Sequence, residues 1–139
     1  MRRSIHRAVL VLILVASSVW ACSNNTTTPT SPTTTLPTIT ATWTGTLNQN
    51  GGTTYPFTAQ VGPIAATLTS IAPDETVRIG MSLGSWNGSA CAVAIASDNL
   101  AQGGAVNGSV SAAGNYCVRV YDVGNIVDPV SFTVILAHY

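Results

Sequence analysis

The chain has 139 residues, of which 46% are hydrophobic and only 7% are charged, and it contains five arginines, five acidic residues and no lysine. Three of the arginines lie within the first seven residues, so residues 22–139 carry two arginines against five acids, a net charge of −3. A nucleic-acid-binding protein needs a basic surface that neutralises phosphates. The charge therefore excludes nucleic acid as a partner.

Residues 1–21 have the pattern of a secretory signal peptide. Three arginines precede an apolar stretch, Ala8–Val19, and Cys22 follows directly after Ala21. The stretch holds about 12 residues, whereas a bilayer core needs roughly 20. The arrangement resembles a bacterial lipoprotein signal with its lipobox, which implies lipid on Cys22 and attachment of the exported protein to the cell envelope. The alternatives are an uncleaved membrane anchor and cleavage beside an unmodified cysteine.

Residues 22–38 are rich in threonine and proline, and Leu36 is their only strongly apolar side chain. Such a segment buries too little surface to offset the entropy lost on ordering. Pro29, Pro32 and Pro37 favour an extended polyproline II conformation, with about 3 Å per residue. We predict a disordered linker that holds the following domain some tens of ångströms from a bilayer.

Residues 39–139 show the two-residue alternation of half-buried strands. Four runs are especially regular: Ile39–Leu47, Tyr55–Val61, Val77–Leu83 and Val130–Leu136. Further strands are expected at Ile64–Ser70, Ala90–Ala96, Ala105–Ser111 and Tyr116–Val123. No helical period follows Ala21. About 100 residues of short strands predict an all-β domain, a two-sheet antiparallel β-sandwich with seven or eight strands.

Residues that favour tight turns separate these runs, since glycine and asparagine tolerate a positive φ. They lie at Asn48–Gly52, Gly62-Pro63, Ala72–Glu75, Trp86–Gly88, Gly103-Gly104, Asn107-Gly108, Gly114-Asn115 and Gly124-Asn125.

The three cysteines divide into one for lipid and two for a disulfide. With Cys22 modified, Cys91 and Cys117 remain, 26 residues apart, and an exported protein would normally oxidise them. The neighbouring histidines and second cysteine pair of a zinc site are missing, so no metal is expected there. Strand alternation places Cys91 on the inward face with Val93 and Ile95, whereas Cys117 shares a face with Arg119. A bulge near Cys117 or a disulfide at the rim of a sheet would reconcile the two, and we favour the rim.

Several segments together are similar to the bacterial pre-peptidase C-terminal (PPC) domain, above all to its stand-alone lipoprotein versions. They are Pro56-Phe57, Leu68-Thr69, Met81–Gly84, Asn87–Cys91, Gly114–Asn125 and Val130–Val134. The resemblance implies a jelly-roll β-sandwich that serves as an accessory module, and some such domains bind carbohydrate, collagen or calcium. It supports the fold more than any ligand, and this chain carries no catalytic domain beside it.

Few residues of the predicted domain are suited to catalysis. His138 is its single histidine and is expected at the exposed end of the last strand, while Asp74 and Glu75 are adjacent residues of a turn. Neither arrangement provides an oriented base for a nucleophile or a separated pair of carboxylates. We therefore predict no enzyme activity, no catalytic residues and no cofactor.

Calcium is a minor alternative, because Asp98-Asn99, Asp122 and Asp128 could supply hard oxygen ligands. The same residue types are common in turns, and Asp122 is better explained as a turn cap or as a partner of Arg119.

Trp86 is the candidate ligand contact. It lies in the predicted loop Gly84–Gly88, outside the alternating pattern, where an indole could meet a sugar ring or a partner protein. Asn87 beside it could add a hydrogen bond. Trp43, by contrast, is expected in the core.

These observations predict a lipid-anchored β-sandwich module of the cell envelope that binds carbohydrate or protein without catalysis. The alternative is a structural envelope lipoprotein without a soluble ligand, and a minor alternative is an accessory to a small secreted hydrolase.

Overall fold

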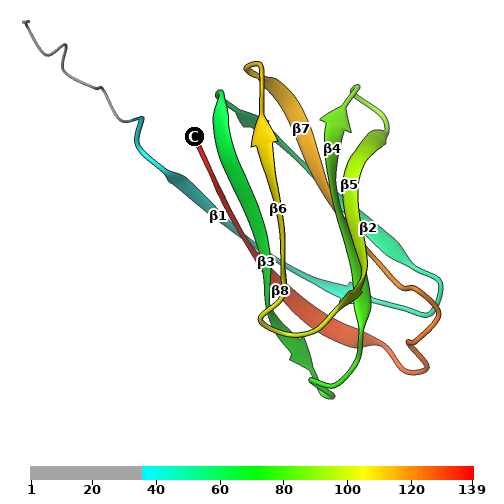
Figure 1. The fold of residues 1–139 in the computed structure, drawn as a ribbon. Coiled ribbons are helices and arrows are strands. Elements are labelled where there is room, and N and C mark those ends of the chain that lie inside the picture. The colour runs from blue at the N-terminus through cyan, green and yellow to red at the C-terminus, as the bar shows by residue number, and fades with distance from the viewer. Residues whose placement is uncertain (1–35) are drawn as a thin grey trace, which may run out of the picture. The chain divides into compact units, whose positions relative to one another are not determined.

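The computed structural model describes residues 36–139, which form eight strands and no helix (Figure 1). The predicted signal peptide, Cys22 with its predicted lipid, and most of the predicted linker lie outside these residues. Within residues 36–139, no helix has the length and hydropathy needed to span a membrane. The strands are β1 (Ile39–Leu47), β2 (Gly52–Ala59), β3 (Gly62–Ala72), β4 (Ile79–Trp86), β5 (Cys91–Leu100), β6 (Ala105–Val110), β7 (Gly114–Tyr121) and β8 (Val130–His138).

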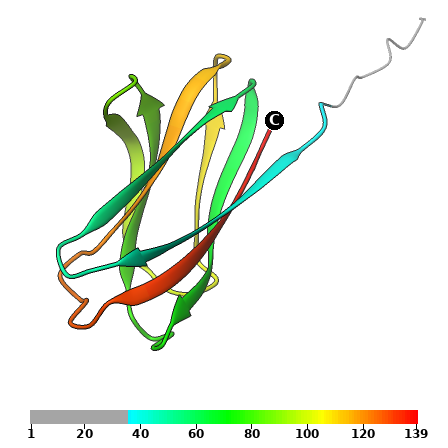
Figure 2. The same cartoon turned by 180° about the vertical axis from the view of Figure 1, so that it is seen from behind.

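The strands form two four-stranded antiparallel sheets that pack face to face, as the views from both sides show (Figures 1 and 2). Sheet A has the order β1-β8-β3-β6, and sheet B has the order β2-β7-β4-β5. Only β4 and β5 are neighbours both in the sequence and in a sheet, since every other connection crosses from one sheet to the other. This order is that of an eight-stranded jelly roll. The predicted fold class is confirmed.

The alternating apolar side chains of the two sheets meet in one core. Strand β8 is the clearest case, because Val130, Phe132, Val134 and Leu136 are all buried while the residues between them are more exposed. Each buried side chain of this size contributes roughly 1.5–3 kcal/mol relative to the exposed state. Apolar residues of β3, β4 and β7 meet them from both sheets. The apolar residues that alternate in the sequence thus form the inner face of each sheet.

Three predicted turns lie in strands instead. Asn107-Gly108 lies inside β6, while Gly62-Pro63 begins β3 and Gly114-Asn115 begins β7. Gly108 and Gly114 lack the positive φ that such a turn needs; among the described glycines only Gly62, Gly88, Gly103 and Gly124 adopt one. Glycine permits a turn but does not impose one, so pairing with neighbouring strands kept these segments extended.

Aromatic side chains close one open side of the sandwich, between edge strands β1 and β2. The rings of Trp43 and Tyr55 stack with their centroids 5.0 Å apart, and Phe57 lies 6.0 Å from Trp43. Trp43 is partly buried against the core. The prediction for His138 is wrong: its side chain is only 5% exposed, and its ring lies 5.2 Å from that of Phe57. It ends the last strand but faces inward, under this aromatic cover.

Candidate functional site

Strand β5 is the most exposed strand of the domain. It forms one edge of sheet B, and the five residues from Ala92 to Ala96 are all exposed, including Val93 at 51% and Ile95 at 43%. Edge strands are usually protected from pairing by proline, or by lysine and other charged residues. Residues 91–97 contain none of these. An uncharged, apolar edge therefore faces solvent.

A bulge explains why β5 is exposed on both faces. Leu83 pairs with Ile95 but Gly84 pairs with Val93, so Ala94 is an extra residue on β5. Side chains opposite each other in an antiparallel pair project to the same face of the sheet. Ile95 therefore faces inward with Leu83, whereas Val93 faces outward with Gly84. The facing of the strand therefore reverses at Ala94, and a second register shift, between Ile79 and Met81 of β4, adds another residue near its far end.

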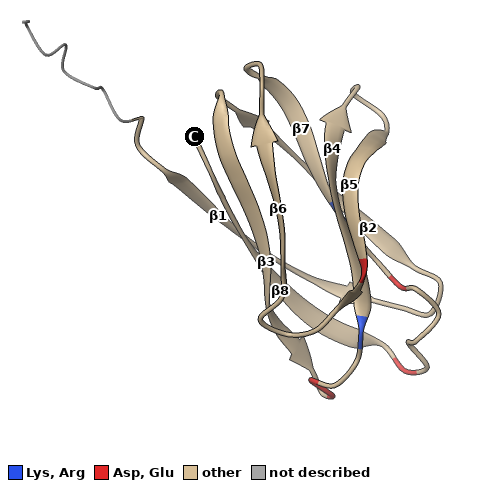
Figure 3. Cartoon of the chain, viewed as in Figure 1, with Lys and Arg blue, Asp and Glu red and all other residues tan. Residues whose placement is uncertain are grey.

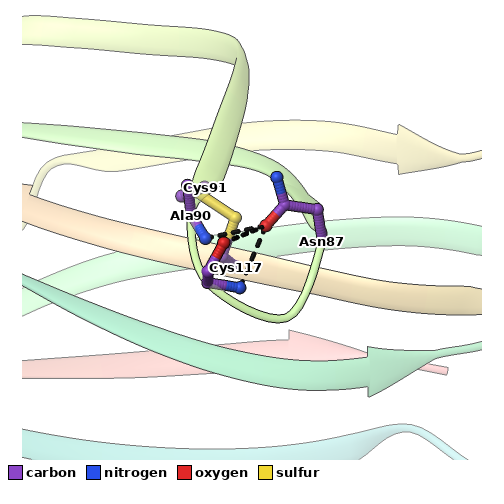
Figure 4. The surroundings of a disulfide bond; sticks show 5 residues. Asn87, Ala90, Cys91 and Cys117 are labelled. Carbon is purple, nitrogen blue, oxygen red and sulfur yellow. Dashed lines mark hydrogen bonds between the residues drawn. A yellow bond between two sulfur atoms is a disulfide. The ribbon is translucent and has the colours of Figure 1, made fainter.

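The same bulge determines where the disulfide lies. Cys91 and Cys117 are bonded, as predicted, with their Cα atoms 5.8 Å apart (Figure 4). The expectation that Cys91 faces inward is wrong, because the bulge turns its half of β5 outward. Cys117 is fully buried on the outer face of sheet B, opposite Gly84. The favoured rim position is therefore also wrong, and the register change lies in β5 rather than near Cys117.

Gly84 allows the start of β5 to lie over β4. A Cβ atom at Gly84 would stand 2.1 Å from the carbonyl oxygen of Ala92, closer than any real contact. The turn before β5 is held by Asn87, whose side-chain oxygen accepts hydrogen bonds from the amides of Ser89 and Ala90 at 2.9 and 2.8 Å (Figure 4). The disulfide and this turn together fix the beginning of the edge strand.

A cleft of about 350 Å³ opens between the sheets beside β5. Its walls are mainly apolar and come from both sheets: Phe57, Ile64, Leu83, Ile95, Val110 and Tyr116. Serines line part of it, at positions 85, 109 and 111. The volume is at the lower end of the range for ligand pockets.

A glycine in β6 leaves this space open. The inward positions of β6 are Val106, Gly108 and Val110, and both valines are buried. A Cβ atom at Gly108 would lie 3.4 Å from Ile64 and 3.7 Å from Leu83, so it would point into the cleft without a clash. The cleft exists because one inward side chain is missing from the alternation.

The cleft lies at the uncharged end of the sandwich. The acids and arginines gather towards the other end, where the β3–β4, β5–β6 and β7–β8 connections lie (Figure 3). No acidic or basic side chain lines the cleft. The hydroxyl of Tyr116 donates a hydrogen bond of 2.6 Å to the carbonyl oxygen of Ala112. The cleft can therefore bind through apolar contacts and hydrogen bonds.

The carboxylate of Asp122 caps a turn. One oxygen accepts hydrogen bonds from the amides of Gly124, Asn125 and Ile126 at 2.8, 2.9 and 3.2 Å, and the other accepts one from Asn50 at 2.8 Å. Partial burial acts to raise the pKa of Asp122, but the four amide donors outweigh it and lower the pKa below its ordinary value. Of the two structural roles expected for Asp122, a turn cap or a partner of Arg119, the structure shows the turn cap.

The remaining calcium candidates do not gather around Asp122. Asp98 accepts a hydrogen bond from the hydroxyl of Tyr121, and Arg119 lies over the Tyr121 ring at 5.2 Å. Burial, this hydrogen bond and the charge of Asp98 raise the pKa of Tyr121 to about 12, against the opposing charge of Arg119. Among residues 36–139, no three histidine, cysteine or acidic side chains are grouped as metal ligands.

Replacing Asp122 with alanine should lower the free energy of unfolding by about 1–2 kcal/mol, because four amides lose their acceptor. In the wild type, a lowered folded pKa means that the unfolded chain binds the proton more readily. The stabilisation is therefore present above roughly pH 4 and is lost as pH falls through the folded pKa. Urea unfolding from pH 7 to pH 3 measures both effects. Equal acid sensitivity of wild type and Asp122→Ala would contradict this role.

The predicted contact residues lie apart from the cleft. Trp86 is half-buried and is the last residue of β4 rather than part of a loop. Its neighbour Ser85 lines the cleft, and adjacent strand residues face opposite sides of a sheet, so Trp86 faces outward. The side-chain oxygen of Asn87 is already used within its turn. Their role in binding stays a prediction. The cleft itself was not predicted, although Gly108 at an inward position of a valine-rich strand could have indicated it.

No family model matches the chain, and no curated protein matches it. Two solved structures share its fold. One is Aeromonas hydrophila PliG, a periplasmic lysozyme inhibitor of g-type lysozyme, with 17% identity and a TM-score of 0.50 over 70% of this chain and 84% of that one. The other is the Yersinia pseudotuberculosis-derived mitogen, with 14% identity and a TM-score of 0.51 over 71% and 83%. At such identities the likeness establishes a β-sandwich and nothing finer.

Proposed function

We propose that the chain is an exported, non-catalytic β-sandwich that binds a protein partner at the cell envelope and is attached there by lipid on Cys22. The observation that carries the proposal is the largely exposed, uncharged segment Cys91–Ser97 of edge strand β5 beside an open apolar cleft. Exposed apolar surface of this kind marks interaction sites in soluble domains. A protein partner can satisfy the backbone groups of an edge strand, which a sugar surface does only in part.

Two further observations support this proposal. The disulfide fits an oxidising compartment outside the cytoplasm. PliG is described as a periplasmic inhibitor of another protein, and the name of the Yersinia protein describes a mitogen, so neither name describes an enzyme. Membership of the PPC family stays a proposal from the residues quoted above, and it agrees with an accessory binding role.

The lipid anchor is tested at Cys22. Cys22→Ala should convert a protein that sediments with membranes and dissolves in detergent into one that stays soluble or unprocessed, because the thiol that would carry diacylglycerol is gone. Membrane fractionation and mass spectrometry of the N-terminal peptide provide the measurement. A native protein without lipid on that cysteine would refute anchoring and leave the binding proposal intact.

Protein binding is tested by photo-crosslinking in intact envelopes. A photoreactive amino acid replaces Ala94 on the exposed edge, and in a matched control it replaces Thr42, which is exposed on β1 in sheet A. We expect a discrete protein adduct from position 94 and none from position 42. Adducts that contain only glycan or lipid, or equal adducts from both positions, would refute the proposed function.

A further inference from the structure

We infer that the partner contributes an extended, uncharged segment that pairs with the free edge of β5 and places one apolar side chain in the cleft beside Gly108. This inference rests on the proposed function and specifies its binding mode. Three features of the described residues support it: an unpaired backbone edge on β5, a missing side chain at Gly108 in the facing strand β6, and the absence of charge around the edge from Cys91 to Ser97 and the cleft.

The backbone of β5 is available for strand addition. In sheet B its only ladder neighbour is β4, so the backbone groups on its other edge have no strand partner. The exposed residues Ala92–Ala96 span about 17 Å at roughly 3.4 Å per residue, the length of a common strand. An extended peptide can add to such an edge through main-chain hydrogen bonds, while pockets for alternate side chains provide specificity.

The cleft provides such a pocket. It lies next to β5, since Ile95 forms part of its wall. The direction of a Cβ atom at Gly108 marks the place that a side chain from this domain would have occupied, between Ile64, Leu83 and Ile95. An aliphatic or aromatic side chain from a neighbouring strand could occupy the same place. Its environment would then resemble the core on either side of it.

The absence of charge at the β5 edge and in the cleft indicates that the partner's segment is uncharged. The edge from Cys91 to Ser97 and the lining of the cleft contain no charged side chain. A lysine or glutamate in the added segment would be desolvated without an opposite charge, which costs free energy. The segment that fits is therefore uncharged over the residues that pair with β5.

A second copy of this chain fits less well. Pairing of β5 with β5 of another copy would supply an uncharged strand, but Ile95 already forms the wall of its own cleft and Val93 faces the outer side. Neither could fill the cleft of the other copy.

The test combines peptide probes, with and without N-methyl groups that block strand pairing, with variants of the protein that fill the cleft. The probes are fluorescent heptapeptides that alternate threonine with valine and carry leucine, isoleucine, phenylalanine or tyrosine at the centre. A second set has N-methyl groups on alternate amides, which prevents ladder formation along one edge. The full-length protein in lipid nanodiscs is compared with Gly108→Met and with Asn107→Met, which adds the same side chain on the outer face of β6. Gly108→Ala serves as a milder filling variant.

We expect at least one unmethylated peptide to bind, and its binding to slow amide hydrogen exchange across Ala92–Ala96. Gly108→Met should weaken this binding by about tenfold or more, because the central side chain can no longer enter the cleft. Asn107→Met should change it less than about twofold. The unfolding midpoint of Gly108→Met should be unchanged or higher, since a Cβ atom at position 108 meets only ordinary van der Waals contacts and the rest of the side chain enters the open cleft.

Four results would overturn the inference. They are no binding by any of the peptides, equal binding of the N-methylated set, undiminished binding to Gly108→Met and Gly108→Ala, and protection of Ala92–Ala96 by self-association of the protein without peptide. A protein adduct from position 94 together with any of these would leave the proposed function standing and refute only strand addition.

Discussion

Removing the disulfide through Cys91→Ser with Cys117→Ser is expected to lower the free energy of unfolding by roughly 3–4 kcal/mol. The bond closes a loop across 26 residues, and in the chain-entropy model this loop gives a stabilisation of that size. Domains of this length are stable by about 5–15 kcal/mol in total. Denaturant unfolding of oxidised wild type and of the double variant measures the difference.

The position of the bond predicts which part of the domain responds first. Cys91 is the first residue of β5, at the edge of sheet B. Loss of the disulfide should therefore speed amide exchange in residues 91–96 more than in β8. Wild-type protein reduced under native conditions serves as the control without substitution. Two free thiols in protein isolated from an oxidising compartment, or an unchanged midpoint after reduction, would contradict the structural role of the bond.

Gly84→Ala is expected to destabilise the domain by about 2–3 kcal/mol or more, because the new Cβ atom would meet the backbone of Ala92 at 2.1 Å. Backbone cannot rotate away as a side chain can, so the start of β5 must move. The displacement should also weaken partner binding at the β5 edge. Thermal unfolding and the crosslinking yield from position 94 measure the two effects.

Gly114→Ala is the matched control, since a Cβ atom there would have only one neighbour, a ring carbon of Tyr116 at 3.9 Å, and its φ is not positive. It should change stability by less than about 0.5 kcal/mol. Equal effects of the two substitutions would show that β5 is free to shift and that Gly84 is not needed for its position.

The fold could be predicted from the sequence because its strands are regular. In β1, threonines alternate with Ala41, Trp43 and Leu47, and in β8 the apolar residues occupy every second position from Val130. A period of two allows only one face of each strand to be buried. Turn residues were less reliable, since Asn107-Gly108 and Gly114-Asn115 turned out to be strand.

The candidate site could not be predicted in the same way. Its cleft depends on Gly108 facing Ile64 and Leu83 from another part of the chain, a relation that no local pattern contains. The outward direction of Cys91 and Val93 depends on an extra residue in β5, Ala94, opposite the step from Leu83 to Gly84 of β4. A bulge of this kind is set by pairing between strands, so alternation alone placed Cys91 on the wrong face.

The sequence by itself determined the all-β class and the pairing of Cys91 with Cys117, because the first follows from local periodicity and the second from elimination. Only the tertiary structure decided which strands lie at the edges, where the disulfide crosses sheet B, and that His138 is buried. Those features arise when segments distant in sequence pack together, and burial, register and cavity shape are properties of that packing. The open cleft beside β5, on which the proposed function rests, belongs to this second group.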